Sequence, residues 1–243
     1  MGGCLMSRLC TICARGGSKG VIGKNTRELL GMPLIAHSIA QAKISGLFDL
    51  IAVSSDSDEI LQTAKIFGVD ILVKRPDEMA GDTSPKLPAI RHCVKEVEKT
   101  TGRAFNTLVD LDATSPLRIP EDITAAVSLL EEKAVSNVIT GSPARRSPYF
   151  NLVEINALGI VELSKPPRSP IVRRQDSPKC YDMNASIYVW TYEALFRDPA
   201  IFQKDTLLYV MPEDRSIDID SELDFMFVDF LMKKRGNHEN HRL

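Results

Sequence analysis

The sequence lacks the features that mark membrane, secreted and nucleic-acid-binding proteins. Its apolar runs, such as residues 225–228, fall far short of the roughly 18 residues that span a bilayer, and its start has no apolar run long enough for a secretion signal. Lysine and arginine number 30 against 32 aspartates and glutamates, so the net charge of −2 gives no general attraction for nucleic acid or anionic membranes. We therefore expect a cytoplasmic protein in which any anion site is local.

Histidine and cysteine, which serve in many nucleophilic and zinc sites, are few and poorly placed. Five cysteines, an odd number, do not indicate a disulfide framework. Cys10 and Cys13 form a C-x-x-C pair in a strand-like run, where residues three apart point to opposite faces, and no second pair completes a zinc site. The four histidines have no metal-ligand spacing and no G-x-S-x-G motif occurs. Covalent catalysis therefore has little support.

What is present predicts an α/β fold, with a mostly parallel sheet flanked by helices. The chain has 243 residues, of which 44% are hydrophobic and 26% charged, as in one large folded domain. Short apolar runs alternate with helical patterns, as βα units require. The expected strands are residues 9–14, 49–54, 69–73, 107–111, 137–140, 187–190 and 207–211. Helices should begin near Pro33, Ser57, Pro85, Pro120 and Ser221. We assign the domain to residues 8–234 and a flexible tail to residues 235–243.

Residues 143–182 differ in character and are interpreted as an insertion. Six of the 14 prolines fall within residues 143–178, where six basic residues oppose three acidic ones in an otherwise acidic chain. Residues 150–155 and 160–163 flank Asn156-Ala157-Leu158-Gly159, which predicts a small β-hairpin.

The strongest candidate site is the loop Arg15-Gly16-Gly17-Ser18-Lys19-Gly20, which follows the first predicted strand. Its glycines allow a ligand to approach the backbone, and Arg15, Lys19 and Lys24 supply positive charge, so the loop suits phosphate. It matches neither the Walker A nor the dinucleotide-binding spacing. A plain strand-to-helix connection is the alternative, although ligands of α/β sheets do bind at the carboxyl ends of strands.

A second candidate site is Ser216-Ile217-Asp218-Ile219-Asp220. Asp218 and Asp220 should project to one side of an extended segment while the isoleucines anchor the other side. Two carboxylates this close repel one another, and a hard cation such as Mg²⁺, completed by water and phosphate oxygens, would relieve the repulsion. The alternative is a solvated strand end in which Asp220 assists the following helix.

Asp110 and Asp112 repeat this spacing at the end of a predicted central strand. A buried strand rarely carries an acid without a partner, so Asp112 is a metal or substrate candidate, or the structural partner of a basic residue such as Arg118. Arg75, which precedes a proline, could equally hold an anion or face water.

Three motifs, in order, resemble the signatures of the acylneuraminate cytidylyltransferases, the CMP-sialic acid synthetases. They are Ala14-Arg15-Gly16-Gly17-Ser18-Lys19-Gly20 with Lys24-Asn25, Thr114-Ser115-Pro116-Leu117-Arg118, and Ser216-Ile217-Asp218-Ile219-Asp220 with Asp224. The resemblance runs from about Leu9 to Phe230. It implies a Rossmann-like nucleotidyltransferase fold and a homodimer whose insertion reaches the partner's site. It also implies the reaction of CTP with a nonulosonic acid to give a CMP-sugar and pyrophosphate.

The resemblance further implies roles for individual residues. Nucleotide contacts would come from Ala14, Arg15, Gly16, Gly17, Ser18, Lys19, Asn25, Arg75 and Asp82. Sugar contacts would come from Asp112, Arg174, Tyr181 and Asn184. Mg²⁺ would bind Asp218 and Asp220, and the catalytic group would comprise Arg15, Lys19, Lys24, Asp218 and Asp220. No general base is assigned.

Departures from the sialic acid pattern favour one branch of the family. Asp112-Ala113 replaces the usual Gln-Pro, and Asp182 stands where arginine is common. Exchanging a cation for an anion beside the sugar should change the side chain that is accepted. These positions resemble the bacterial branch that activates N,N'-diacetyllegionaminic acid.

Four alternatives remain. Two are enzymes of the same chemistry, acting on N-acetylneuraminic acid or on the eight-carbon acid Kdo. A third is a non-catalytic module that binds nucleotide sugars. The fourth is a glycosyltransferase in which Asp110 and Asp112 form a metal-binding D-x-D motif.

Overall fold

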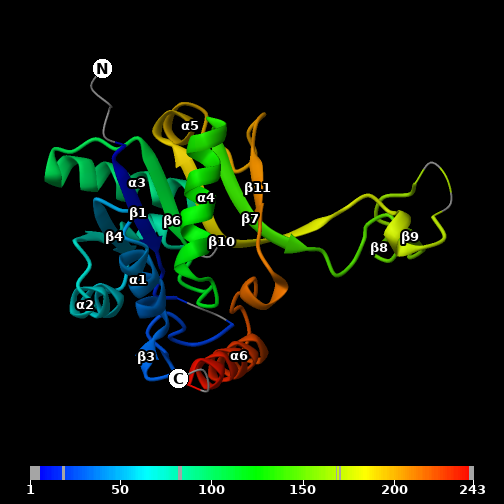
Figure 1. Ribbon diagram of the computed structural model, residues 1–243, viewed down its shortest axis with the longest axis horizontal. Helices are drawn as coiled ribbons and strands as arrows, with labels where there is room; N and C mark the ends of the chain where they lie inside the picture. Colours follow the sequence, from blue (N-terminus) through cyan, green and yellow to red (C-terminus); the bar gives the residue numbers. More distant parts are fainter. Residues whose placement is uncertain (1–5, 18–19, 82–83, 168, 170, 241–243) are drawn as a thin grey trace.

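The computed structural model describes residues 6–240, except for 18, 19, 82, 83, 168 and 170. A seven-stranded sheet forms its centre, in the order β11-β7-β10-β6-β1-β4-β5 (Figure 1). These strands are β1 (Arg8–Cys13), β4 (Leu50–Ser55), β5 (Ile71–Lys74), β6 (Thr107–Leu111), β7 (Asn137–Pro143), β10 (Tyr181–Thr191) and β11 (Leu207–Val210). Strand β10 alone runs antiparallel to its neighbours β6 and β7, while the other pairings are parallel. The predicted α/β fold with a mostly parallel sheet is confirmed.

Helices cover both faces of this sheet. The described helices are α1 (Leu34–Ser45), α2 (Asp58–Ile66), α3 (Lys86–Thr101), α4 (Pro120–Lys133), α5 (Tyr192–Arg197) and α6 (Glu222–Asn240), of which α6 packs beyond the end of the sheet rather than on a face. Helices α1, α2 and α4 pack on the face that carries Cys10, and α3 and α5 pack on the face that carries Cys13. The prediction that these two cysteines point to opposite faces is confirmed. None of the described helices combines the length and the apolar character needed to cross a membrane.

The helix starts follow the predicted signals. Helix α2 is capped by Ser57, whose hydroxyl accepts a hydrogen bond from the Ile60 amide, and α4 begins at Pro120. Pro85 and Pro33 immediately precede their helices rather than occupying the first helical position. Pro33 instead ends β3 (Met32–Pro33), which pairs with β2 (Glu28–Leu29).

A third, smaller core lies at the carboxyl end of the sheet and joins the three motifs of the sequence. It contains Val21 beside the glycine loop, Leu117 of the Thr-Ser-Pro segment, Ile219 between the two aspartates, and Phe225 of α6. All four side chains are less than a tenth exposed. Burial of these apolar groups therefore holds three distant stretches of sequence together.

An ion pair fixes the approach to the Asp218 segment. The Arg215 guanidinium, in the 3₁₀ turn η3 (Glu213–Arg215), donates from Nε at 2.9 Å and Nη2 at 2.8 Å to the buried carboxylate of Asp122 in α4. Asp122 also accepts a hydrogen bond from the Ile119 amide at the start of α4. This buried pair ties the chain before Asp218 to the helix that follows the Thr-Ser-Pro segment.

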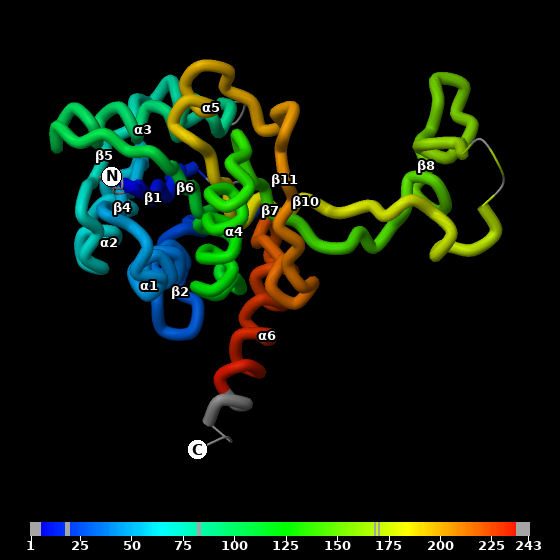
Figure 2. The backbone as a smooth tube through the Cα atoms, turned by 45° about the horizontal axis from the view of Figure 1, so that its top comes forward, coloured from blue at the N-terminus to red at the C-terminus, as the bar shows by residue number. Residues whose placement is uncertain are grey.

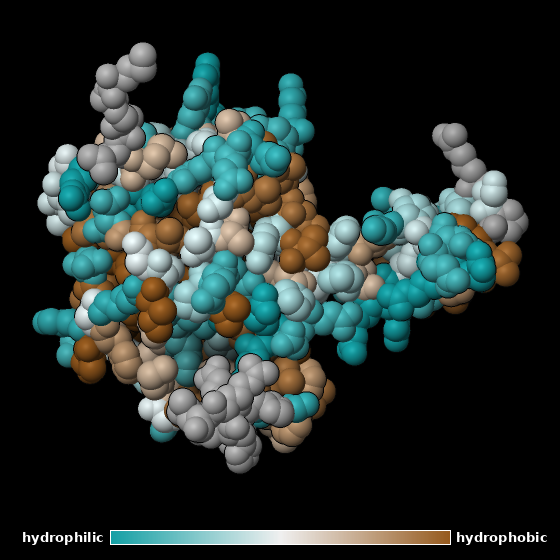
Figure 3. Space-filling view, viewed as in Figure 1, coloured by the Kyte–Doolittle hydropathy of each residue, from teal (hydrophilic) through white to brown (hydrophobic). Residues whose placement is uncertain are grey.

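The chain between β7 and β10 forms an arm that projects from the domain (Figures 1 and 2). We call residues 144–180 the arm. It carries the predicted hairpin, with β8 (Val153–Ile155) paired to β9 (Val161–Leu163), and the 3₁₀ turn η2 (Arg174–Asp176). Ile155 and Val161 are 72% and 60% exposed, so the hairpin has little core of its own. On the face shown in Figure 3, hydrophilic residues cover much of the arm.

Several elements differ from the prediction, among them β2 and β3, which were not predicted. Strand β10 has 11 residues rather than four because it continues through polar residues, with an irregularity between Met183 and Tyr188. Helix α5 was not predicted. Helix α6 continues to Asn240, beyond the predicted domain end at residue 234.

Candidate active site

The main candidate site is a cavity of about 400 Å³ at the carboxyl ends of β1, β5 and β6. Seven predicted site residues line it: Ala14, Arg15, Lys24, Asn25, Arg75, Asp112 and Asp220. Ser18, Lys19 and Asp82 lie outside the described residues. The start of α3 and the short 3₁₀ turn η1 (Asp77–Met79) complete the wall. The cavity thus joins the glycine loop to Asp220, whereas Asp218 does not line it.

The glycines of the loop have different surroundings. The Gly16 amide donates to Asp56 Oδ1 at 3.0 Å, so Gly16 connects the loop to the start of α2. Gly17 has open space where a Cβ atom would stand. At Gly20 a Cβ atom would lie 1.9 Å from the carbonyl oxygen of Asp220. Gly20 therefore permits a backbone contact between the loop and the acidic segment that no other residue would allow.

Lys24 joins the same two segments through its side chain. Its ammonium donates to the carbonyl oxygen of Ile219 at 2.5 Å and lies 3.3 Å from Asp220 Oδ1. The Lys24 side chain is 13% exposed, whereas that of Asp220 is 77% exposed. The ammonium is thereby fixed at the cavity wall, and the carboxylate remains accessible to a ligand.

Asn25 and Arg75 provide buried polar groups to the cavity. Asn25 donates from Nδ2 to the Arg15 carbonyl at 2.9 Å, and its buried Oδ1 atom has no hydrogen-bond partner among the residues that the structure describes. An unsatisfied buried acceptor is costly unless a ligand supplies a donor such as a hydroxyl. Arg75 is 5% exposed and donates to the Ser54 carbonyl at 2.9 Å. The alternative that Arg75 faces water is therefore wrong.

The isoleucines beside Asp218 and Asp220 lie on the buried side, as predicted, but the two aspartates line different cavities. Ile219 between them is fully buried, and Ile217 packs against the same core. Burial raises the pKa of the Asp218 carboxyl, and the negative charges of Asp220, Asp112 and Asp224 raise it further. Asp218 faces a neighbouring cavity of about 430 Å³ beside α6 rather than the main one. A cation beside this group would relieve the accumulated repulsion.

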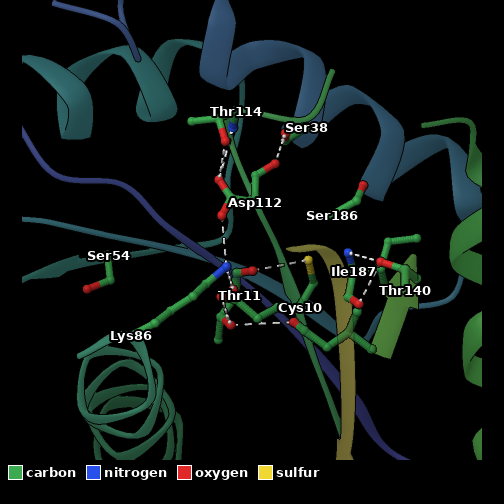
Figure 4. Close-up of polar contacts among 12 residues, drawn as sticks. Cys10, Thr11, Ser38, Ser54, Lys86, Asp112, Thr114, Thr140, Ser186 and Ile187 are labelled. Atoms are coloured by element: carbon green, nitrogen blue, oxygen red, sulfur yellow. Dashed lines mark hydrogen bonds and ion pairs between the residues drawn. The ribbon is translucent and has the colours of Figure 1, made fainter. Parts of the chain in front are cut away.

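Lys86 is the residue that sequence reasoning missed. Its ammonium lies 2.9 Å from Asp112 Oδ2 (Figure 4). It also lies 3.0 Å from Asp110 Oδ2 and over the Tyr188 ring. Burial lowers the pKa of Lys86, but the two carboxylates outweigh burial and raise it well above the ordinary value. The sequence did contain one sign of this contact. A lysine in the first turn of a helix is unfavourable because its charge opposes the helix dipole, so a compensating contact is expected.

The same contact corrects the proposed pairing of Asp112 with Arg118. The Asp112 carboxylate is bound by Lys86, and by the amide and hydroxyl of Thr114 at 3.0 and 2.9 Å. Arg118 is 1% exposed and donates instead to the carbonyl oxygens of Asp112 and Ser186, and to the Ser38 hydroxyl. Burial lowers the pKa of Arg118 to about 10. Arg118 therefore fastens the Thr-Ser-Pro segment to α1 and β10.

The three other sugar-contact candidates lie outside the lining of the main cavity. Asn184 is buried, and its Oδ1 accepts hydrogen bonds from the Thr140 hydroxyl at 2.6 Å and the Ser186 amide at 3.2 Å. Arg174 and Tyr181 line a separate cavity of about 590 Å³ at the arm. This second cavity is basic, since Arg146 and Lys179 also line it and no acidic residue is among its described lining residues.

Comparisons with known proteins agree with this arrangement. Residues 9–210 match the family described as cytidylyltransferase. The chain is 48% identical to the CMP-N,N'-diacetyllegionaminic acid synthase of Campylobacter jejuni, over 94% of this chain and 96% of that protein. It is 45% identical to the post-translational flagellin modification protein B of Campylobacter coli, with the same coverage.

A solved structure shares the fold at lower sequence identity. A CMP:2-keto-3-deoxy-manno-octonic acid synthetase complexed with CTP superposes with a TM-score of 0.69 at 16% identity, covering 94% of this chain and 99% of that one. This likeness is one of fold alone. Taken with the match over residues 9–210 and the relatives above, it leaves one conclusion: the chain belongs to the cytidylyltransferase family.

Proposed function

We propose that this protein transfers CMP from CTP to a nonulosonic acid, releasing pyrophosphate, and that its preferred acceptor is N,N'-diacetyllegionaminic acid. The observation that carries the proposal is the contact of the glycine loop with the Asp218–Asp220 segment, made by Gly20 and Lys24 at the wall of one cavity. The identity to the C. jejuni synthase, with Asp112 and Asp182 in place of the sialic acid pattern, supports the choice of acceptor.

The chain's own residues account for most of the required catalysis. The acceptor hydroxyl must attack the α-phosphorus in line, so the enzyme mainly positions two anions and neutralises the charge that develops on pyrophosphate. Lys24 supplies a positive charge at the cavity wall, and Arg75 a second one. The free Oδ1 of Asn25 can accept a hydrogen bond from a nucleotide hydroxyl.

The acidic segment fits Mg²⁺ held jointly by protein and substrate. Among the residues that the structure describes, no group of three or more histidine, cysteine, aspartate or glutamate side chains forms a ready-made metal cage. Mg²⁺ often binds one or two carboxylates and takes its other ligands from water and substrate phosphates. Asp218 and Asp220 would hold the ion. When bound, it would supply charge neutralisation at the phosphates.

The arm supports a homodimer in which each arm completes the partner's site. Within one chain, Arg174 and Tyr181 line a basic cavity separate from the main one, and the hairpin exposes apolar side chains. A nonulosonic acid is an anion, so a basic surface suits it. In a twofold dimer the arm of one subunit would bring this surface to the main cavity of the other.

Subunit complementation tests this arrangement. Asp220→Ala and Arg174→Ala should each inactivate the homodimer, whereas mixed dimers contain one site without either substitution. Random mixing should restore about one quarter of wild-type activity, since half of the dimers are mixed and each has one intact site. No recovery in a sample shown to contain mixed dimers would contradict the shared site. Full activity of Arg174→Ala alone would also contradict it.

The reaction itself is tested by the products formed from CTP, Mg²⁺ and N,N'-diacetyllegionaminic acid. We expect pyrophosphate and the CMP-sugar in equal amounts. Release of a nucleoside diphosphate would instead indicate the glycosyltransferase, a reaction that we disfavour because Lys86 already neutralises Asp110 and Asp112. CTP binding without turnover would indicate a binding module. Since CTP is an intracellular nucleotide, we also place the protein in the cytoplasm.

A further inference from the structure

Lys86, Asp110 and Asp112 form a buried charge cluster that the reaction as described does not use. Asp110 is 1% exposed and accepts a hydrogen bond from the Thr11 hydroxyl at 2.8 Å, so its carboxylate belongs to the interior. Asp112 and Lys86 line the main cavity. Figure 4 shows Lys86 extending from α3 toward Asp112 and Thr11. The ammonium therefore separates an interior carboxylate from one at the cavity wall.

The Asp112 carboxylate keeps capacity for a further hydrogen bond. Its Oδ1 accepts from the Thr114 amide and hydroxyl, and Oδ2 accepts from Lys86. A carboxylate offers about four acceptor positions, so Oδ2 has one left toward the cavity. Burial raises the pKa of Asp112, but the Lys86 charge and the bonds from Thr114 outweigh burial and lower it to about 2. Asp112 is thus a fixed anion.

A fixed negative charge at this wall of the cavity favours contact with only some chemical groups of the substrates. Its charge would repel the phosphates of CTP and the carboxylate of the sugar acid. It would attract an N–H or O–H donor, which the sugar side chain supplies. Asp112 is also close enough to Asp218 for its charge to raise the pKa of that carboxyl.

We propose that Lys86 is a positioning residue for the acceptor: it holds Asp112 as an ionised hydrogen-bond acceptor for a donor group of the sugar acid. This proposal rests on the proposed function. Without Lys86, two neighbouring carboxylates would lose the cation between them, and the repulsion would protonate or displace Asp112. The charged and titratable groups around the Asp110 and Asp112 carboxylates are Lys86, Tyr188, Arg118, Asp218, Cys10 and Cys13.

Steady-state kinetics on four variants test this assignment. Asp112→Asn and Lys86→Met should each raise the KM for the sugar acid by about 10-fold or more while the KM for CTP changes by less than about 2-fold. Asp110→Asn, which leaves the Lys86–Asp112 pair in place, should act like wild type. The double variant Lys86→Met/Asp110→Asn removes one charge of each sign and should return the sugar KM to within about 3-fold of wild type.

Each other outcome overturns the proposal. A larger CTP KM in Asp112→Asn would place Asp112 at the nucleotide. If the double variant folds but its KM for the sugar acid does not return toward the wild-type value, the Lys86 ammonium itself is needed at the substrate. If Lys86→Met does not fold, the double variant still decides the matter. Wild-type protein that forms no CMP-sugar would refute the proposed function instead, so the two failures are distinguishable.

Discussion

Asp218→Asn should abolish CMP transfer and, at the same time, raise the melting temperature of the protein when no divalent ion is present. Burial raises the pKa of this carboxyl, and the charges of Asp220, Asp112 and Asp224 raise it further, so the folded state disfavours its ionised form. Above its folded pKa the ionised group destabilises the protein. Asparagine keeps the shape and removes the charge. Asp218→Asn would also remove a proposed ligand of the Mg²⁺ that neutralises phosphate charge, and this loss should lower kcat by roughly 10²-fold or more.

The sign of the stability effect depends on pH. A carboxyl with a raised folded pKa contributes stability at low pH, and this contribution is lost as the pH rises through the folded value. The increase in melting temperature caused by Asp218→Asn should therefore appear near neutral pH and above. It should vanish below the ordinary pKa of 3.8, where both states are protonated. Thermal melts in chelator across this pH range measure the effect.

Asp224→Asn is the matched control with the opposite sign. Burial would raise the Asp224 pKa, but hydrogen bonds from the hydroxyl and amide of Ser221 and the amide of Asp220 outweigh burial and lower it. Removing this charge should lower the melting temperature near neutral pH. A lower melting temperature in Asp218→Asn, or retained turnover, would contradict the account of Asp218.

Gly20→Ala should reduce activity by about 10²-fold, because it must separate two segments of the active site. The new Cβ atom would lie 1.9 Å from the Asp220 carbonyl oxygen, and that oxygen belongs to the backbone and cannot rotate away. The contact forces the loop and the acidic segment apart, and displacements of about 1 Å at a reacting centre cost on that order. We also expect a loss of about 1–3 kcal/mol in the free energy of unfolding, as for other overpacked sites.

Gly17→Ala is the comparison within the same loop. Its Cβ atom would meet nothing within 4 Å, so the melting temperature should equal that of wild type. Denaturant unfolding and pyrophosphate release on both variants separate a steric effect from a general intolerance of the loop. Equal destabilisation by the two substitutions, or an unaffected Gly20→Ala, would contradict the close contact.

The sheet and most helices could be predicted because buried strands and helices have recognisable patterns of apolar residues in the sequence. Strands buried on both faces form apolar runs, and Ser57, Pro85 and Pro120 mark helix starts. Strand β10 was too short in the prediction because its first half carries Asp182, Asn184 and Ser186, which leave no apolar pattern. Helix α5, with six residues, offers too few turns to show a period.

The site was predictable where one motif contributes several residues and less so where distant residues meet. The glycine loop and the two aspartates could be predicted as site residues because their spacing suits phosphate and a divalent cation. The position of Lys86 between Asp110 and Asp112 depends on how α3 packs against the sheet, which no local pattern reveals. The arm residues Arg174 and Tyr181 were assigned by resemblance, since no local motif marks them, and they line a cavity separate from the main one.

The most direct test of the central claim is to compare kcat/KM for CTP-dependent pyrophosphate release across four acceptors. The panel offers N,N'-diacetyllegionaminic, N-acetylneuraminic, pseudaminic and Kdo acids in parallel to the purified protein with Mg²⁺. We expect pyrophosphate release with N,N'-diacetyllegionaminic acid at the highest kcat/KM. A preference for N-acetylneuraminic acid would contradict the acceptor assignment. No release with any of the four, despite CTP binding, would contradict the proposed reaction.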